Sequence, residues 1–123
     1  MRKYMVNDWV DIDTPCKVLE VGEYHLYVEY PDGRRRYTNE KPIPIPLTDD
    51  IYLLNGFRKE KDVYYGEISD RYTEICSGEI NVYNNDGTVH ASIYRDKIEN
   101  VDELQLSLRA MGLNDFADNL KIM

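Results

Sequence analysis

"EINVYNNDGTVHASIY", residues 79–94, has the pattern of two strands joined by a tight turn. Apolar and polar side chains alternate in both halves, which is typical of strands that bury one face. The turn "NNDG" combines Asn, Asp and Gly, which tolerate the positive φ angles of short hairpin loops. We therefore predict an antiparallel hairpin whose buried face is formed by Ile80, Val82, Val89, Ala91 and Ile93.

The segments on either side of this hairpin predict the rest of a small sheet and one helix that covers it. "DVYYGEIS" and "YTEICS" precede the hairpin and have strand-like composition. After it, Asn100 and Glu103 form a capping-box-like start in "ENVDELQLSLRAMGLNDFADNL", and Gly112 gives a stop. Apolar residues recur in that segment at helical spacing, so we expect the helix to pack on the inner face of the sheet through Val101, Leu104, Leu108 and Met111.

A second, shorter helix is predicted before these strands. Thr48 can cap it, Asp49 and Asp50 complement its positive first turn, and Gly56 can end it in a left-handed conformation. The preceding "KPIPIPLT" has alternate prolines that deny backbone donors to a helix or an inner strand. We expect an extended connector with its isoleucines held against a core; recognition as a polyproline ligand is the alternative.

Four strand-like runs fill the first part of the chain: "DWVDI", "CKVLEV", "YHLYVEY" and "RRRY". Short strands of this number, rich in Val and Tyr, can close into a small SH3-like antiparallel β-barrel. The fold class predicted for the whole chain is therefore α+β. Residues 1–45 would form the SH3-like subdomain and residues 46–123 the α+β subdomain.

Composition narrows the classes of function. The formal net charge is -8 over 123 residues, divided as -1 for residues 1–45 and -7 for residues 46–123. Such a charge repels nucleic acid, so direct nucleic-acid binding is not expected, whereas a basic protein partner is. With 42% hydrophobic residues and no apolar run near the roughly 20 residues of a membrane span, we expect a cytoplasmic protein without membrane contact.

Motifs for catalysis and metal binding are missing from the sequence. Cys16 and Cys76 have no paired spacing and are expected as reduced, buried thiols. His25 and His90 are the only histidines and belong to no metal-binding motif. Cys76 and Ser77 stand beside a glycine, but no nucleophile elbow is present. We therefore predict a binding protein rather than an enzyme, with no metal and no cofactor.

Tyrosines and arginines supply the candidate binding residues. Eleven tyrosines and one tryptophan are many for this length, and tyrosine offers rigid contact area with one polar tip. Three consecutive arginines stand in "PDGRRRY", residues 31–37. We predict either a solvated hairpin or the cationic rim of a site for a phosphorylated or acidic partner. The candidate residues are Trp9, Tyr30, Arg34, Arg35, Arg36 and Tyr37.

Strand register decides which arginines are available. A two-residue turn would place Arg36 opposite Glu29 and Tyr37 opposite Val28, and we favour it because it puts Tyr37 on the apolar side. A three-residue loop that includes Pro31 would place Arg35 opposite Glu29 instead. Either register leaves two arginines without a local partner.

The segments "PIPLTDDIYLLNGF" and "VDELQLSLRAMGL" resemble a family of small uncharacterised proteins of prophages and mobile elements of anaerobic gut bacteria. In that family a strand-rich stretch precedes the "PIPLT" connector, a short helix ending in "NGF", further strands and a closing helix. The likeness covers most of the chain from Pro44 onward, although Asp102 and Leu106 stand where relatives often carry histidine. The family implies a mobile-element setting but no activity.

Two functions follow as expectations. The first is a non-catalytic accessory protein of a phage or mobile element that binds a host or phage protein, such as a basic or nucleic-acid-binding one, and inhibits host defence. The second is sequestration of a phosphorylated small molecule, such as a signalling nucleotide. An enzyme of unrecognised type ranks last, and a homo-oligomer stays an open alternative.

Overall fold

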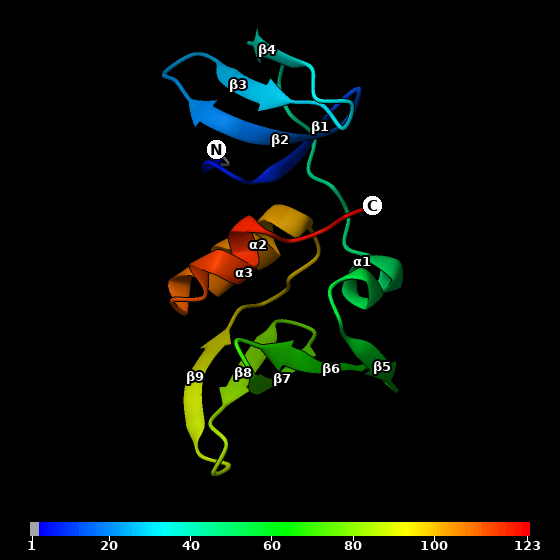
Figure 1. Cartoon of the computed structure of the whole chain (residues 1–123), viewed down its shortest axis with the longest axis vertical. Coiled ribbons are helices and arrows are strands. Elements are labelled where there is room, and N and C mark those ends of the chain that lie inside the picture. The colour runs from blue at the N-terminus through cyan, green and yellow to red at the C-terminus, as the bar shows by residue number, and fades with distance from the viewer. Residues whose placement is uncertain (1–2) are drawn as a thin grey trace. The chain divides into compact units, whose positions relative to one another are not determined.

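Two antiparallel sheets and three short helices give the chain an α+β fold in the computed structural model, which describes residues 3–123 (Figure 1). The chain divides into two units. Met1–Pro46 with Asn100–Asp102 form the first, and Leu47–Glu99 with Glu103–Met123 form the second. The α+β class is as the sequence predicts.

The sheet of the first unit is an open four-stranded meander in the order β1-β2-β3-β4, not the closed barrel that we expected. The edge strands β1 and β4 do not pair with each other. Beyond β2, β1 has one isolated bridge among the described residues, to Ile43 of the later connector, whose N–H and C=O bond to Asp11 at 2.9 Å each. The strands are β1 (Trp9–Ile12), β2 (Thr14–Val21), β3 (Leu26–Glu29) and β4 (Arg35–Thr38). Its core is Val10, Ile12, Cys16, Val18, Leu26 and Val28.

The proline-rich connector is extended, as predicted. It forms no regular strand or helix, because Pro42, Pro44 and Pro46 lack the N–H that either would use. Its two isoleucines differ: Ile45 is buried, whereas the Ile43 side chain is 63% exposed although its backbone is bonded. Only one isoleucine is therefore held against a core.

The first helix, α1 (Asp49–Leu54), begins and ends as the sequence predicts. The Thr48 hydroxyl accepts a hydrogen bond from the N–H of Ile51 at 3.3 Å, and Asp49 and Asp50 lie in the first turn. Gly56 follows the helix with a φ of 87°, which favours glycine.

The second unit contains a five-stranded meander, β5-β6-β7-β8-β9. The predicted hairpin forms, with the N–H of Asn84 donating to the carbonyl of Thr88 at 2.8 Å. A bulge follows, so that Val89 pairs with Tyr83 and is 57% exposed rather than buried as predicted. The strands are β5 (Arg58–Glu60), β6 (Val63–Ile68), β7 (Arg71–Cys76), β8 (Glu79–Tyr83) and β9 (Val89–Tyr94).

One face of this sheet is packed against aromatic side chains of the same unit. A Cβ on Gly66 would lie 2.6 Å from the ring of Phe57, so the ring rests directly on the strand at that glycine. Phe57 in turn packs edge-on against Phe116, with ring centroids 6.1 Å apart. The buried side chains on this inner face are Ile68, Thr73, Ile75, Ile80 and Val82.

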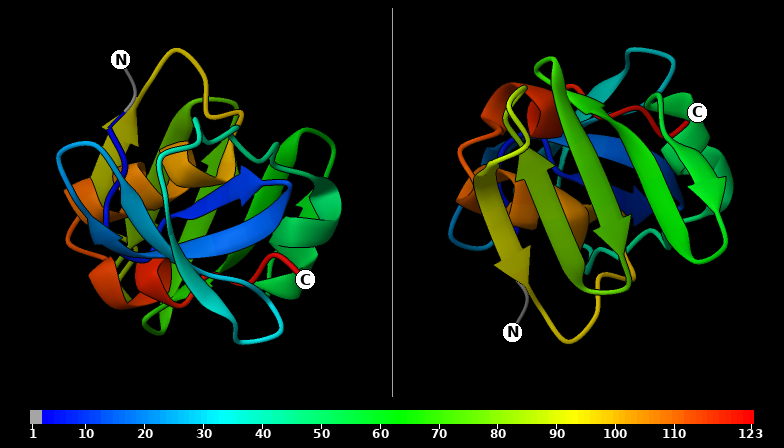
Figure 2. Two further views of the ribbon diagram at one scale, coloured as in Figure 1. Left: turned by 90° about the horizontal axis from the view of Figure 1, so that it is seen from above. Right: turned by 90° about the horizontal axis from the view of Figure 1, so that it is seen from below.

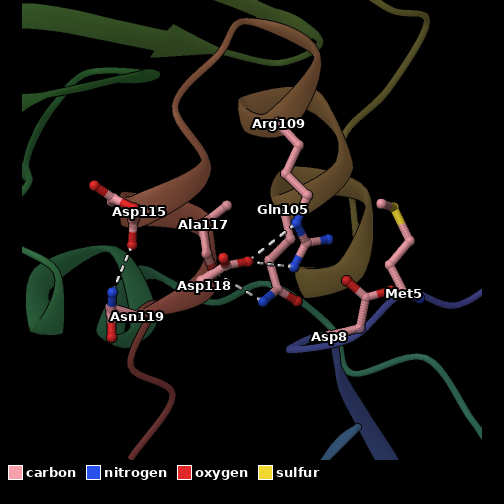
Figure 3. Close-up of polar contacts among 8 residues, drawn as sticks. All are labelled: Met5, Asp8, Gln105, Arg109, Asp115, Ala117, Asp118 and Asn119. Carbon is pink, nitrogen blue, oxygen red and sulfur yellow. Dashed lines mark hydrogen bonds and ion pairs between the residues drawn. The ribbon is translucent and has the colours of Figure 1, made fainter. Parts of the chain in front are cut away.

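The C-terminal segment contains two helices where one was predicted. α2 (Val101–Ala110) ends before Gly112, as expected, and α3 (Asn114–Asp118) was not foreseen. Figure 3 shows the contacts that join them: Gln105 donates to the carbonyl of Ala117 at 3.0 Å, and the Arg109 guanidinium pairs with Asp118 at 3.2 Å. Because Arg109 is 8% exposed, this ion pair is largely shielded from water.

Both cysteines are free, as predicted, but Cys76 is only half-buried, unlike Cys16. Burial raises the pKa of the Cys16 thiol. Among the helices of the described residues, none has the length and apolar character needed to cross a membrane.

Candidate functional site

The outer face of the five-stranded sheet is the candidate site. Side chains alternate across each strand, so the buried residues Gly66, Thr73 and Val82 define the inner face and their neighbours define the outer one. The view from below shows this sheet in front, with no described helix of the second unit over its outer side (Figure 2, right). We call this surface the tyrosine face; its central members are Tyr65, Glu67, Tyr72, Glu74, Asn81 and Tyr83.

Three tyrosines from neighbouring strands form a row across this face. The ring centroids of Tyr65 and Tyr72 are 6.1 Å apart, and those of Tyr72 and Tyr83 are 6.0 Å apart. The tyrosines lie on β6, β7 and β8, so the pairing of these strands fixes the spacing of their backbone positions. Tyr72 is 41% exposed. The row therefore offers continuous aromatic area to a partner.

Carboxylates surround the row. Glu67 pairs with Tyr72 across β6 and β7, and Glu74 pairs with Tyr65. The Tyr72 hydroxyl donates to Glu74 at 3.2 Å; burial and this hydrogen bond raise the pKa of Tyr72. Glu79 also lies on this side of β8. The tyrosine face is thus both aromatic and acidic.

A hollow of about 470 Å³ opens at one end of the row. It lies between the β6–β7 turn and the β8–β9 loop, and none of the described residues that line it is basic. A basic side chain in this hollow would meet three carboxylates and two tyrosine rings. The lining residues are Glu67, Asp70, Tyr72, Glu74, Tyr83, Asn84, Asn85 and Gly87.

The turn that brings Asp70 to the hollow has an unusual backbone. Ser69 and Asp70 have φ angles of 52° and 63°, both in the left-handed region, as in a two-residue type I′ hairpin turn. That turn matches the twist of the flanking strands and keeps Ile68 paired with Arg71. The turn places the Asp70 carboxylate where β6 meets β7, close to Glu67 of β6 and Tyr72 of β7.

Within residues 3–123, no three metal-ligating side chains converge closely enough to hold a metal ion. The carboxylates that line the hollow are among the side chains that do not converge in this way. One contact with an organic cation exists within the chain itself. The Arg58 guanidinium lies over the ring of Tyr65, 5.7 Å from its centroid. The first tyrosine of the row thus already accepts a guanidinium.

The arginines singled out from the sequence lie elsewhere, on the β3–β4 hairpin of the first unit. The structure pairs Glu29 with Arg35 and Val28 with Arg36, so the favoured two-residue register is wrong and the three-residue alternative is confirmed. Gly33 closes the loop with a φ of 89°, and the N–H of Tyr30 donates to the carbonyl of Arg34 at 2.8 Å.

Each of the three arginines has an acidic partner, which corrects the prediction that two would have none. Arg34 pairs with Asp32 at 2.6 Å and Arg35 with Glu29 at 2.8 Å. Asp32 lies in the loop and Glu29 is the last residue of β3, so both partners are local. Hydrogen bonding to Glu29 raises the pKa of Arg35.

Arg36 has the most contacts of the three. Its Nε donates to the Tyr30 hydroxyl at 2.6 Å, and its Nη2 lies 3.3 Å from a Glu40 carboxylate oxygen. Its guanidinium also lies 5.6 Å from the centroid of the Tyr30 ring, and Arg34 lies 5.7 Å from it. The hydrogen bond to Tyr30 raises the pKa of Arg36.

Four of the six candidate residues come together. Tyr30 and the three arginines line a hollow of about 420 Å³ that also includes Asp13 and Thr14. Tyr37 lies apart from it, against Tyr27 with ring centroids 4.4 Å apart. Trp9 is half-buried on β1, with the Lys17 ammonium 5.8 Å from its ring centroid. Trp9 and Tyr37 are therefore not part of this arginine hollow.

Sequence reasoning missed the tyrosine face. Alternation in "VYYGEI" places Tyr65 and Glu67 on one side of a strand, and this signal was available. The row itself depends on which residues of β7 and β8 stand side by side, and the sequence alone did not fix that register.

Comparison of the chain with family models, with curated protein sequences and with solved structures found no match. The resemblance to small mobile-element proteins therefore stays a prediction.

Proposed function

We propose that this protein is a non-catalytic binding protein whose tyrosine face captures an arginine- or lysine-rich segment of another protein. The observation that carries the proposal is the hollow in which Glu67, Asp70 and Glu74 surround the rings of Tyr72 and Tyr83. Aromatic rings attract cations through their faces, and carboxylates add charge-assisted hydrogen bonds to a guanidinium. The charge of -7 on residues 46–123, which include the whole second unit, steers a basic partner toward that part of the chain.

The nature of the surface supports a macromolecular partner over a small molecule. The tyrosines are spread over three strands instead of converging in a deep pocket, and their rigid side chains lose little entropy on binding. An extended basic segment can contact the row along its length. In the mobile-element setting that the sequence resemblance implies, we propose a basic host or phage protein, such as a nucleic-acid-binding one, as the partner and inhibition of host defence as the result.

The test is the affinity for a labelled peptide of alternating arginine and glycine, measured by fluorescence anisotropy. Any acidic protein attracts such a peptide, so a matched pair of variants is needed. Glu67→Gln/Glu74→Gln removes two charges from the tyrosine face, and Glu20→Gln/Glu23→Gln removes two exposed charges from the first unit. We expect the first pair to weaken binding about tenfold or more and the second by less than about twofold. Equal effects of the two pairs would refute the proposal.

A natural partner is then sought by pull-down from host lysate. The wild-type chain serves as bait and Glu67→Gln/Glu74→Gln as the negative bait. A basic protein retained by the first and not by the second supports the proposal. Retention that is equal on both baits contradicts it.

Capture of a phosphorylated small molecule is the second candidate function, because three guanidinium groups line the arginine hollow. A phosphate there would compete with Asp32, Glu29 and Glu40, which already pair with the arginines. Thermal shift against a panel of nucleotides tests it, since a ligand well above its Kd stabilises the folded state by a few kcal/mol. Absence of any shift rejects this second function.

For the first unit we propose an SH3-like arrangement that has opened, with the Ile43 connector taking the place of the closing strand. The backbone bridge between Asp11 and Ile43 supports it. An experimental structure in which Ile43 is not bonded to β1 would contradict it.

A further inference from the structure

Strand β9 is an edge of the five-stranded sheet, and its second side has no partner strand among the described residues. We propose that β9 pairs with β9 of a second copy of this chain, in antiparallel fashion, so that one continuous sheet runs through both copies. This inference does not depend on what the tyrosine face binds.

The composition of β9 favours strand pairing. Protein edge strands are normally protected by short length, by charged residues or by proline. The opposite edge of the same sheet follows this rule, because β5 has three residues, Arg58, Lys59 and Glu60, all charged and exposed. β9 has six residues, Val-His-Ala-Ser-Ile-Tyr, with no Lys, Arg, Asp, Glu or Pro. Two copies of β9 therefore meet without like-charge repulsion, which makes a second copy the fitting occupant.

Hydrogen-bond directions show which groups are available at this edge. The N–H of Arg95 donates to the carbonyl of Gly78 at 2.7 Å, toward β8. Because bonding direction alternates along an antiparallel strand, Ile93 also bonds toward β8, while Ser92 and Tyr94 direct their N–H and C=O groups to the open edge. Figure 1 shows β9 at the end of its sheet.

The register of the pairing follows from these directions and from the bulge. The bulge beside Val89 distorts the start of β9, which leaves residues 91–94, continued by Arg95 with its bond to Gly78, as the regularly paired stretch. A two-fold axis at their centre, Ile93, places Ser92 of each copy opposite Tyr94 of the other, so all outward groups of both residues are bonded. It also places Ile93 against Ile93 on the inner face, where Ile93 already pairs with Ile80. A register is favoured when the buried faces of both paired strands lie on the same side of the sheet, and this register meets that condition.

The exposed side chains agree with this register. Tyr94 is 75% exposed, and in the pair it lies beside Ser92 of the other copy on the outer face. The tyrosine face would then continue from one copy into the next. A two-fold pair would present two identical hollows on one surface.

Analytical ultracentrifugation over a range of protein concentrations tests the proposal, together with Ser92→Pro and Ser92→Thr. Proline at position 92 removes the N–H that points to the open edge and therefore blocks pairing with a second copy. It breaks no hydrogen bond to β8, and edge strands tolerate proline on their open side. We expect the wild type and Ser92→Thr to reach twice the mass of one chain and Ser92→Pro to stay monomeric with an unchanged circular dichroism spectrum. A monomeric wild type at all concentrations, or a dimer that survives Ser92→Pro, would overturn it.

Cysteine cross-linking tests the register separately. Paired residues at Ile93 would have Cα atoms about 4.5 Å apart, within disulfide range, so Ile93→Cys should form a linked dimer under mild oxidation. Val89→Cys, which is equally part of β9, would be separated from its copy by eight residue steps, or about 27 Å, and should not cross-link. Wild-type protein controls for Cys16 and Cys76. Equal cross-linking of both variants contradicts the register.

Discussion

The ring centroids of Tyr72 and Tyr83, on neighbouring strands, are 6.0 Å apart, and both residues line an acidic hollow. Tyr72 is the central member of a row that also includes Tyr65. A cation seated in the hollow would touch two rings at once, whereas one beyond Tyr65 would touch a ring already covered by Arg58. On the proposed function, we therefore expect a basic partner to gain most at the pair Tyr72 and Tyr83.

Tyr72→Ala should weaken binding of the arginine-glycine peptide. It removes one ring of the hollow, and a cation–π contact of about 1 to 2 kcal/mol corresponds to roughly fivefold to thirtyfold in Kd. Fluorescence anisotropy measures the change. Tyr24→Ala is the matched control, because Tyr24 is 82% exposed and lies in the first unit. A larger loss with Tyr24→Ala than with Tyr72→Ala would contradict the placement of the site.

Arg34→Gln/Arg36→Gln should leave binding of the same peptide unchanged or slightly stronger. These arginines lie on the hairpin of the first unit, and removing two positive charges only increases attraction for a basic peptide. The anisotropy titration is repeated at two salt concentrations. Weaker binding in this variant would show that the arginine hairpin takes part.

Gly78→Ala should destabilise the fold by roughly 2 to 4 kcal/mol. A Cβ at this position would lie 1.8 Å from the carbonyl oxygen of Arg95, which is backbone and cannot move aside cheaply. Urea unfolding followed by circular dichroism gives the free energy of unfolding.

Gly87→Ala is the comparison for this variant. Gly87 has a φ of 87° but open space around it, so only backbone strain of about 1 kcal/mol opposes the new side chain. If Gly87→Ala lowers the free energy of unfolding as much as Gly78→Ala does, the close approach to the Arg95 carbonyl is not the cause of the loss at Gly78.

Tyr64→Phe should change how stability depends on pH. Burial, with the hydrogen bond to Asp49, raises the pKa of Tyr64 from 10.0 to about 12. The raised value contributes stability that is fully present below pH 10.0 and is lost as pH rises toward about 12. The same hydrogen bond lowers the pKa of Asp49 below 3.8, so its contribution is present above pH 3.8 and is lost as pH falls further.

Melting temperatures of wild type and Tyr64→Phe across the pH range give the test. We expect their difference to be largest at neutral pH and to shrink toward both extremes. Tyr24→Phe serves as the control. A difference that stays constant from neutral pH through the alkaline range would mean that Tyr64 and Asp49 do not interact as described.

Local signals in the sequence predicted the elements well. Thr48 caps α1, Gly56 ends it, and the loop after Tyr83 turns the chain as its composition indicated. These features depend on residues close together in the chain, where capping and turn preferences act directly.

The register of the β3–β4 hairpin shows where such reasoning fails. Burial normally fixes register, and on that ground the sequence predicts Tyr37 opposite Val28 on the apolar side. Arg36 takes it instead, since its long side chain donates to the Tyr30 hydroxyl while its charge stays exposed to water. The three-residue loop closed by Gly33 then decides the pairing.

The site was missed for a related reason. The sequence contains every tyrosine and glutamate of the tyrosine face, but the row forms only when β6, β7 and β8 pair in one register. The β6–β7 part of that register goes with positive φ at both Ser69 and Asp70, which residues other than glycine adopt rarely. The three consecutive arginines are conspicuous in the sequence, but each pairs with a local acid.

The most direct test of the central claim is an NMR titration of isotope-labelled protein with the arginine-glycine peptide, in which the amide shifts report where the peptide lies. The account predicts that the largest changes fall on β6, β7 and β8 around Glu67, Tyr72 and Tyr83, and that they disappear in Glu67→Gln/Glu74→Gln. Changes centred on Arg34–Tyr37, or spread evenly over both units, would contradict it.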